Sequence, residues 1–150
     1  MKQDRQKLQG MEDMHINDIM STRPVTVGPH TSLAEAARMM RDADIGDVLV
    51  VDDGKLCGIV TDRDIVVRAL AEGMDPGDTT VHAICSSDMV TVPPDDTLEH
   101  ATSLMREHAL RRLPVTDDGQ LIGMVTLGDL AMERDPRSAL ADISSNAANT

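Results

Sequence analysis

The sequence has no aromatic residues, since Phe, Trp and Tyr are all absent from its 150 positions. Proteins that bind single-stranded nucleic acid commonly stack bases on aromatic rings, so the composition argues against that class. Basic residues are also few, because 14 Lys and Arg stand against 26 Asp and Glu and the formal net charge is −12. This balance argues against non-specific binding to DNA, RNA or an anionic membrane. A phosphate ligand would therefore need a local site.

Long apolar runs are missing too. None approaches the roughly 20 residues of a membrane span, and the polar stretch 1–10 lacks the hydrophobic part of a secretory signal. We therefore expect a cytoplasmic protein that does not bind membranes. Two cysteines, Cys57 and Cys85, are too few for a disulfide framework, which leaves two free thiols or one optional disulfide within or between chains.

Metal and catalytic patterns are equally scarce. The five histidines show none of the spacings typical of zinc sites, so we predict no metal site within the chain. A metal held across an oligomer interface stays open. No Ser or Cys has the partners of a nucleophile, and there is no phosphate-cradling P-loop or dinucleotide fingerprint. The sequence therefore predicts that the protein is not an enzyme and has no obligatory cofactor.

What the chain does contain is an internal repeat. Residues 16–65 align with residues 81–130 without a gap at a constant offset of 65, with 19 identities in 50 positions. Two copies are too few for a solenoid, and a pseudo-two-fold pair sharing one core is the natural outcome. Because each copy combines strands and helices in the order β-α-β-β-α, we predict an α+β fold.

The same elements are predicted in both copies. A short helical turn comes first, and the last helix opens at the Thr that ends the return strand. Between the two middle strands, Asp-Asp-Gly predicts a hairpin turn, since Asp and Gly tolerate positive φ. The expected ranges are turns 16–20 and 81–85, strands 25–27 and 90–92, helices 32–42 and 97–107, strands 48–51 and 113–116, return strands 56–60 and 121–125, and helices 62–70 and 127–134.

In the helix of the first copy, we expect Leu33, Ala36, Ala37 and Met40 to form the buried stripe. The domain boundaries follow from the repeat and from composition. The expected ranges are a flexible tail 1–13, a first domain 14–72, a linker 73–80, a second domain 81–134 and a flexible tail 135–150.

The most specific motif is Gly-x-x-Thr-x-x-Asp, which runs from Gly58 to Asp64 and again from Gly123 to Asp129. The Thr stands where a strand meets the start of a helix, so its hydroxyl and the first free amides can face an anion. The Asp can accept two hydrogen bonds from a ribose diol, and the Gly lets a ligand or another backbone approach closely. The motif therefore suits a nucleoside phosphate.

A purely structural role explains the same residues. Thr-x-x-Asp is a variant of the capping box, in which the Thr caps the helix and the acid returns the bond. Its presence in both copies shows only that the unit was duplicated.

Taken together, the motifs resemble a tandem pair of CBS domains (cystathionine-β-synthase domains, also called a Bateman module) over about residues 14–134. The chain is most similar to small stand-alone CBS-pair proteins of the bacterial hypoxic-response type. The motifs that carry the resemblance are Pro-Val-Thr-Val at 24–27, Asp-Ile-Gly at 44–46, Gly-Ile-Val-Thr-Asp-Arg-Asp-Ile at 58–65, Arg-Arg-Leu-Pro-Val at 111–115 and Gly-Met-Val-Thr-Leu-Gly-Asp-Leu at 123–130.

The resemblance implies two clefts between the domains that bind adenosine ligands such as AMP, ADP, ATP or S-adenosylmethionine. Asp64 and Asp129 would then hold ribose, while Thr61 and Thr126 would lie near the phosphate. The clefts of this family cross the domain boundary. One would join Thr61 and Asp64 to Leu110, Arg111 and Arg112, the other would join Thr126 and Asp129 to Ile45, Gly46 and Asp47, and Ile59 and Met124 would be apolar walls for the base.

The two implied clefts differ in charge. Arg63, Arg111 and Arg112 would make the first favourable for a phosphate, whereas Asp47 takes the place of Arg112 in the second. A carboxylate there should repel a phosphate by about 1 kcal/mol at an effective dielectric near 20 and a separation of about 10–15 Å, and by more at closer range. We therefore expect one competent nucleotide site, built on Asp64 and Arg112, and one weak or nucleoside-only site. The alternative for the Arg pair is a solvated edge or salt bridges in a dimer.

Two functions from different classes remain. The first is a regulatory module that senses an adenosine nucleotide. The second is a homodimeric interaction or stress-response protein that needs no ligand, and family members dimerise through the helices after the return strands and those before the second strands. Because no ring is available, a bound adenine would lie between aliphatic or Met side chains, which favours modest affinity.

Overall fold

Residues 14–134 are described by the structure, a computed structural model of the chain. They form two compact units, one of residues 24–89 and the other of residues 14–23 together with 90–134. The expected tails 1–13 and 135–150 lie outside the described residues. Each unit is therefore built mostly from one repeat and is completed by the opening segment of the other repeat, residues 81–89 in the first unit and 16–23 in the second.

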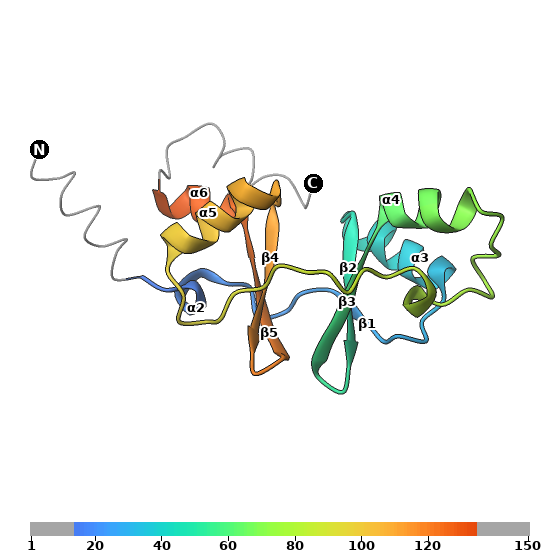
Figure 1. The fold of residues 1–150 in the computed structure, drawn as a ribbon, viewed down its shortest axis with the longest axis horizontal. Helices are drawn as coiled ribbons and strands as arrows, with labels where there is room; N and C mark the ends of the chain where they lie inside the picture. Colours follow the sequence, from blue (N-terminus) through green and yellow to red (C-terminus); the bar gives the residue numbers. More distant parts are fainter. Residues whose placement is uncertain (1–13, 135–150) are drawn as a thin grey trace, which may run out of the picture. The chain divides into compact units, whose positions relative to one another are not determined.

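The first unit, residues 24–89, holds a three-stranded arrangement with helices on one face (Figure 1). Strand β1 pairs in parallel with β2, and β2 pairs antiparallel with β3. Its elements are β1 (Thr26–Val27), α3 (Leu33–Ala43), β2 (Asp47–Asp52), β3 (Lys55–Thr61), α4 (Asp62–Asp64), η1 (Ile65–Leu70) and η2 (Val81–Ala83).

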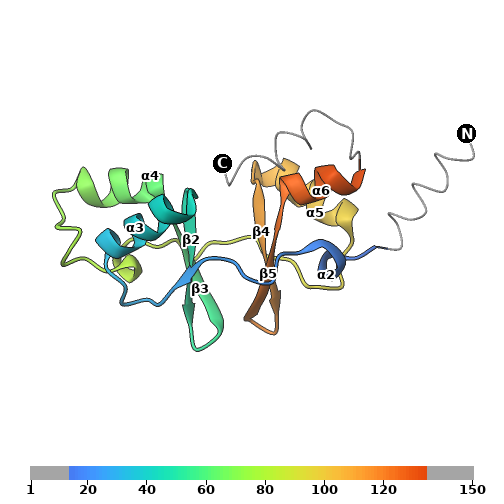
Figure 2. The same cartoon turned by 180° about the vertical axis from the view of Figure 1, so that it is seen from behind.

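The second unit repeats this plan, with α5 and α6 against one face of a hairpin, as the view from behind also shows (Figure 2). Strands β4 and β5 pair antiparallel, and a single parallel bridge joins Val92 to Val115. Its elements are α2 (Ile16–Ile19), α5 (Leu98–His108), β4 (Arg112–Asp117), β5 (Gln120–Thr126) and α6 (Leu127–Arg134). The predicted α+β class is confirmed.

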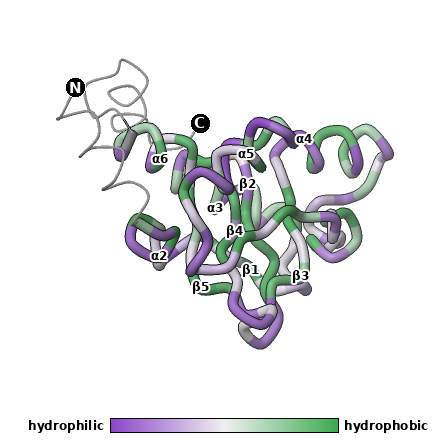
Figure 3. Tube along the Cα trace, turned by 60° about the vertical axis from the view of Figure 1, so that its left-hand side comes forward, coloured by the Kyte–Doolittle hydropathy of each residue, from purple (hydrophilic) through white to green (hydrophobic). Residues whose placement is uncertain are grey.

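Both hairpins turn where Asp-Asp-Gly predicts. Asp53 and Gly54 have φ of 52° and 82°, and Asp118 and Gly119 have φ of 52° and 80°. Two consecutive residues with positive φ give the two-residue turn whose twist matches antiparallel strands. Figure 3 shows hydrophilic chain at a hairpin tip and hydrophobic chain along the strands. The turn residues therefore set the register that carries each Thr-x-x-Asp motif to the end of its strand.

Each unit packs a hydrophobic cluster of aliphatic and Met side chains between its hairpin and its helices, as the missing aromatic residues require. Ala37, which we expected in the buried stripe of α3, is exposed, so that prediction is wrong. Leu33, Ala36 and Met40 alone fill the buried side of the helix, since they follow the i, i+3, i+7 spacing. The buried members are Val27, Leu33, Ala36, Met40, Val48, Val50, Val60, Ala69, Val81 and Ile84 in the first unit, and Ile16, Val92, Leu98, Ala101, Met105, Leu113, Val115, Val125 and Leu130 in the second.

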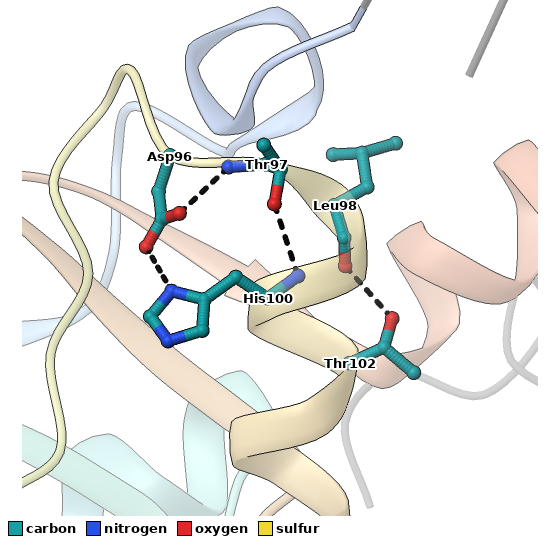
Figure 4. A network of polar contacts seen from close by, with 5 residues as sticks. All are labelled: Asp96, Thr97, Leu98, His100 and Thr102. Carbon is teal, nitrogen blue, oxygen red and sulfur yellow. Dashed lines mark hydrogen bonds and ion pairs between the residues drawn. The ribbon is translucent and has the colours of Figure 1, made fainter. Parts of the chain in front are cut away.

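Side chains cap both middle helices. Ser32 accepts a hydrogen bond from the amide of Glu35 at the start of α3, and Thr97 accepts one from the amide of His100 at 3.1 Å at the start of α5. Around Thr97 the polar contacts extend further (Figure 4): Asp96 accepts from the Thr97 amide at 2.8 Å and lies 2.5 Å from Nδ1 of His100. Capping of this kind stabilises a helix by about 1 kcal/mol.

Two elements differ from the expected pattern. The helix expected over 62–70 is α-helical only in α4, and η1 continues it as a π-helix, in which the amide of Ala71 bonds to the carbonyl of Val66. Three consecutive β-branched residues, Ile65 to Val67, favour an α-helix poorly. The strand expected over 90–92 shrinks to one bridge at Val92, because Pro93 and Pro94 follow and have no amide hydrogen to donate.

Candidate functional site

The two Thr-x-x-Asp motifs lie at the junction between the return strand and the following helix, once in each unit. At the first junction the Thr61 hydroxyl accepts from the Asp64 amide at 3.0 Å, and Oδ2 of Asp64 accepts from the Thr61 amide at 3.0 Å. At the second, the corresponding distances for Thr126 and Asp129 are 3.1 and 2.9 Å. Both motifs are thus closed capping boxes, as the structural alternative predicts.

The capping bonds leave acceptor positions free on both aspartates. Each capping bond uses one lone pair of Oδ2, and Oδ1 of Asp64 and of Asp129 accepts no hydrogen bond from the residues that the structure describes. An ionised carboxylate offers about four acceptor positions. Because both side chains are only half-buried, each carboxylate is accessible from solvent while its Oδ2 is held by the cap, and it can accept two further bonds from a diol. The capping role and the ligand role are therefore compatible.

The segment before the middle strand lies beside the junction in each unit. The carbonyl of Gly46 accepts from the amide of Asp62 at 2.9 Å, and that of Arg111 accepts from the amide of Leu127 at 2.8 Å. These are equivalent positions of the repeat, 65 residues apart. These bonds hold the first turn of the helix beside the residues that precede the middle strand.

Pairing of the strands adds a second contact at each junction. The residue opposite Thr61 in the β2–β3 ladder is Asp47, and the one opposite Thr126 in the β4–β5 ladder is Arg112. The residue paired with the Thr is thus an Asp in the first unit and an Arg in the second. The predicted groupings of Thr61 and Asp64 with 110–112, and of Thr126 and Asp129 with 45–47, join residues of different units and stay predictions.

The other candidate residues fall at or beside these junctions. Ile45, Gly46 and Leu110 are half-buried, whereas Arg63 and Arg111 are exposed. Ile59 is half-buried and Met124 is buried, and each lies two residues before the Thr of its motif.

The glycines of the motif make room for another backbone. A Cβ on Gly58 would lie 2.9 Å from the carbonyl oxygen of Ser86, and one on Gly123 would lie 2.7 Å from that of Ser21 and 2.6 Å from Sδ of Met20. These serines pair with the return strands, since the amides of Ile59 and Met124 donate to their carbonyls. The supporting serines, Ser21 and Ser86, were not among the predicted site residues, although their equivalence at the offset of 65 was a usable signal.

The remaining polar groups form no second centre in the described range. No group of three or more His, Cys, Asp or Glu residues within 14–134 could hold a metal ion, and the five histidines are exposed. Over the same residues, none of the helices combines the length and the apolar character needed to traverse a bilayer.

The fold and the paired junctions define a duplicated α+β module with one strand-to-helix carboxylate site in each unit. Comparison with known proteins gives the family: the CBS domain model matches residues 16–70 and 81–135. The chain belongs to the CBS-domain family and carries two such domains.

Two curated relatives are of similar length. The chain is 41% identical over 133 residues to CBS domain-containing protein YhcV of Bacillus subtilis, and the aligned region covers 86% of this chain and 94% of that protein. It is 38% identical over 115 residues to hypoxic response protein 1 of Mycobacterium tuberculosis, and the aligned region covers 76% of this chain and 80% of that protein.

Solved structures show the same fold and carry different ligands. One of hypoxic response protein I with two coordinated zinc ions is 37% identical, covers 79% of this chain and 97% of its own, and has a TM-score of 0.72. The CBS pair of protein MJ0100 with 5′-methylthioadenosine and S-adenosylmethionine is 29% identical, with coverages of 83% and 98% and a TM-score of 0.70. CBSX2 in complex with AMP is 29% identical, with coverages of 78% and 92% and a TM-score of 0.68.

Proposed function

We propose that this CBS pair is a regulatory module that binds an adenosine nucleotide or a related adenosine ligand and does not itself catalyse a reaction. The observation that carries the proposal is the half-buried aspartate of each closed capping box, whose Oδ1 accepts no bond from the described residues. Two structural neighbours that share the fold hold adenosine compounds, AMP in one and S-adenosylmethionine with methylthioadenosine in the other. The ribose diol is common to all three ligands.

The proposed roles follow from the chemistry of each residue. Asp64 and Asp129 accept bonds from ribose hydroxyls, and Thr61 and Thr126 stand near the phosphate at the start of a helix. Arg63, Arg111 and Arg112 favour the phosphate, while Ile45, Ile59, Leu110 and Met124 contact the base. Ligand binding regulates only if the ligand has different affinities for two states of the protein.

A thermal-shift series tests this proposal. With AMP, ADP, ATP or S-adenosylmethionine at about 100 times its Kd, a ligand that binds only the folded chain stabilises it by about 2.7 kcal/mol, so Tm should rise by several degrees. Guanosine monophosphate serves as the control for base specificity. No shift with any adenosine compound would contradict the proposal and favour a protein that needs no ligand.

A second candidate function, a homodimeric interaction protein, is favoured by an exposed apolar surface on η1 and just after it. Val66, Val67, Leu70 and Met74 expose 54, 46, 63 and 39% of their area. Single exposed apolar residues are ordinary, whereas four exposed apolar side chains within residues 66–74 favour a protein contact. A second copy of the chain is the partner we propose for this surface.

Light scattering measures this association. Val67→Glu places a charge in the apolar surface and should shift the mass of the particle from the dimer towards the monomer. Lys55→Glu, at an exposed position of the hairpin, is the charge control and should leave the mass unchanged. A wild-type chain that is monomeric at micromolar concentration would remove the homodimer from consideration.

A further inference from the structure

The two cysteines, which the proposed ligand site does not use, lie in the same unit and beside the same glycine. Both thiols are free and half-buried, and both pack against the hydrophobic cluster of residues 24–89. The Cβ position of Gly58 lies 3.0 Å from Sγ of Cys85 and 3.2 Å from its Cβ. Cys57 immediately precedes Gly58 in the sequence, so the Cα atoms of the two residues are about 3.8 Å apart.

A strand irregularity turns Cys57 out of the regular ladder. The register of β2 and β3 shifts between Val50 and Val51: Val50 is opposite Gly58 and Val51 is opposite Leu56, which leaves Cys57 without a partner. Such a bulge re-aims the side chain of the extra residue. Here the side chain packs on the cluster that Cys85 also contacts.

The segment that carries Cys85 is held against β3 by two hydrogen bonds. The amide of Ile59 donates to the carbonyl of Ser86, and the amide of Ser86 donates to the carbonyl of Ile59, both at 3.0 Å. The thiols themselves make only weak contacts, from Cys57 to the carbonyl of Lys55 at 3.5 Å and from Cys85 to that of His82 at 3.7 Å.

We propose that Cys57 and Cys85 form a reversible disulfide within the chain when a two-electron oxidant such as hydrogen peroxide is present. One thiolate attacks a peroxide oxygen and becomes a sulfenic acid, with release of hydroxide. The second thiolate then attacks the sulfenic sulfur, the S–S bond forms, and hydroxide leaves. One peroxide is reduced to two waters, once both hydroxides have taken up the two thiol protons.

The bond would join β3, which ends at the Thr61 junction, to the segment that follows η2. Residues 57 and 85 are 28 positions apart, and a link over that span restricts the unfolded chain. The oxidised protein should therefore melt higher than the reduced one, by about 5 °C or more.

The test uses the full chain, fully reduced and freed of reductant, with hydrogen peroxide at low protein concentration. Intact mass spectrometry should show loss of about 2 Da, and alkylation followed by digestion should show simultaneous loss of both reactive thiols and a peptide that links 57 to 85. The rate of linkage should not depend on protein concentration, and dithiothreitol should reverse it. Cys57→Ser and Cys85→Ser should each abolish the linked peptide.

Other products overturn the proposal. Conversion of one cysteine to a sulfinic acid without linkage, or a concentration-dependent link between two chains, would each contradict it. The repeat offers a matched positive control, because Met20 and Ile122 are equivalent to Cys85 and Cys57 at the offset of 65. Met20→Cys with Ile122→Cys, in a chain whose own cysteines are replaced by Ser, should form the equivalent disulfide. Failure to form it would contradict the inference that residues at these two positions lie close enough to be linked.

Discussion

Replacing Asp64 by Ala is expected to weaken the binding of AMP and ATP on the order of 100-fold, whereas Asp129→Ala should change it far less. The proposed role of Asp64 is to accept two hydrogen bonds from a ribose diol, and bonds to a charged acceptor contribute about 1.5 kcal/mol or more each. Two such bonds amount to about 3 kcal/mol, which corresponds to the stated change in Kd.

Titration calorimetry with AMP and ATP measures the effect. The two variants are matched, because each removes the Oδ2 that accepts from the Thr amide of its own capping box, at 3.0 Å for Asp64 and 2.9 Å for Asp129. Both should therefore lose a similar stability, about 1 kcal/mol. Any difference in affinity between them then reports on the ligand and not on the cap.

The expected asymmetry rests on charge. Arg63, Arg111 and Arg112 are the basic residues near the predicted first cleft of a chain whose net charge is −12. In the predicted second cleft, the position equivalent to Arg112 is Asp47. Equal losses of affinity in Asp64→Ala and Asp129→Ala would contradict the asymmetry between the two sites but would still support nucleotide binding. Unchanged affinity in both variants would remove these aspartates from the site altogether.

Much of the fold could be predicted because its signals are local. The turn sequence Asp-Asp-Gly determines both hairpins through positive φ, and Ser32 and Thr97 cap the helices that the apolar spacing predicts. The capping box could also be read from spacing alone. These features depend on residues within four positions of each other, and a duplicated sequence shows each of them twice.

The features that sequence analysis missed depend on contacts over long distances. Residues 16–23 open the first repeat but pack with the second, and the segment with Ser86 opens the second repeat but packs with the first. Because the repeats are alike, the sequence of a segment does not tell which of two similar strands it pairs with. The π-helical turn of η1 was missed for a different reason, since apolar spacing does not separate it from an α-helix.

Replacing Gly123 by Ala should lower the free energy of unfolding by about 2–3 kcal/mol, because the added methyl group has no space. Its position lies 2.7 Å from the backbone oxygen of Ser21 and 2.6 Å from Sδ of Met20, both closer than Cβ atoms are found in proteins. The flexible Met side chain can move, but the backbone oxygen is held by the bond from the amide of Met124 at 2.9 Å. The strand or the segment of residues 14–23 must therefore shift.

Urea unfolding of matched variants measures this cost. Gly28→Ala is the control, since nothing lies within 4 Å of its Cβ position and its φ is not positive, so this variant should be neutral or slightly more stable. Adding Met20→Ala to Gly123→Ala separates the two clashes: the side-chain contact disappears while the contact with the Ser21 oxygen stays. If the double variant recovered the stability of Met20→Ala alone, the backbone would not be the obstacle, and the glycine of the motif would be needed for the Met side chain and not for the close approach of the segment.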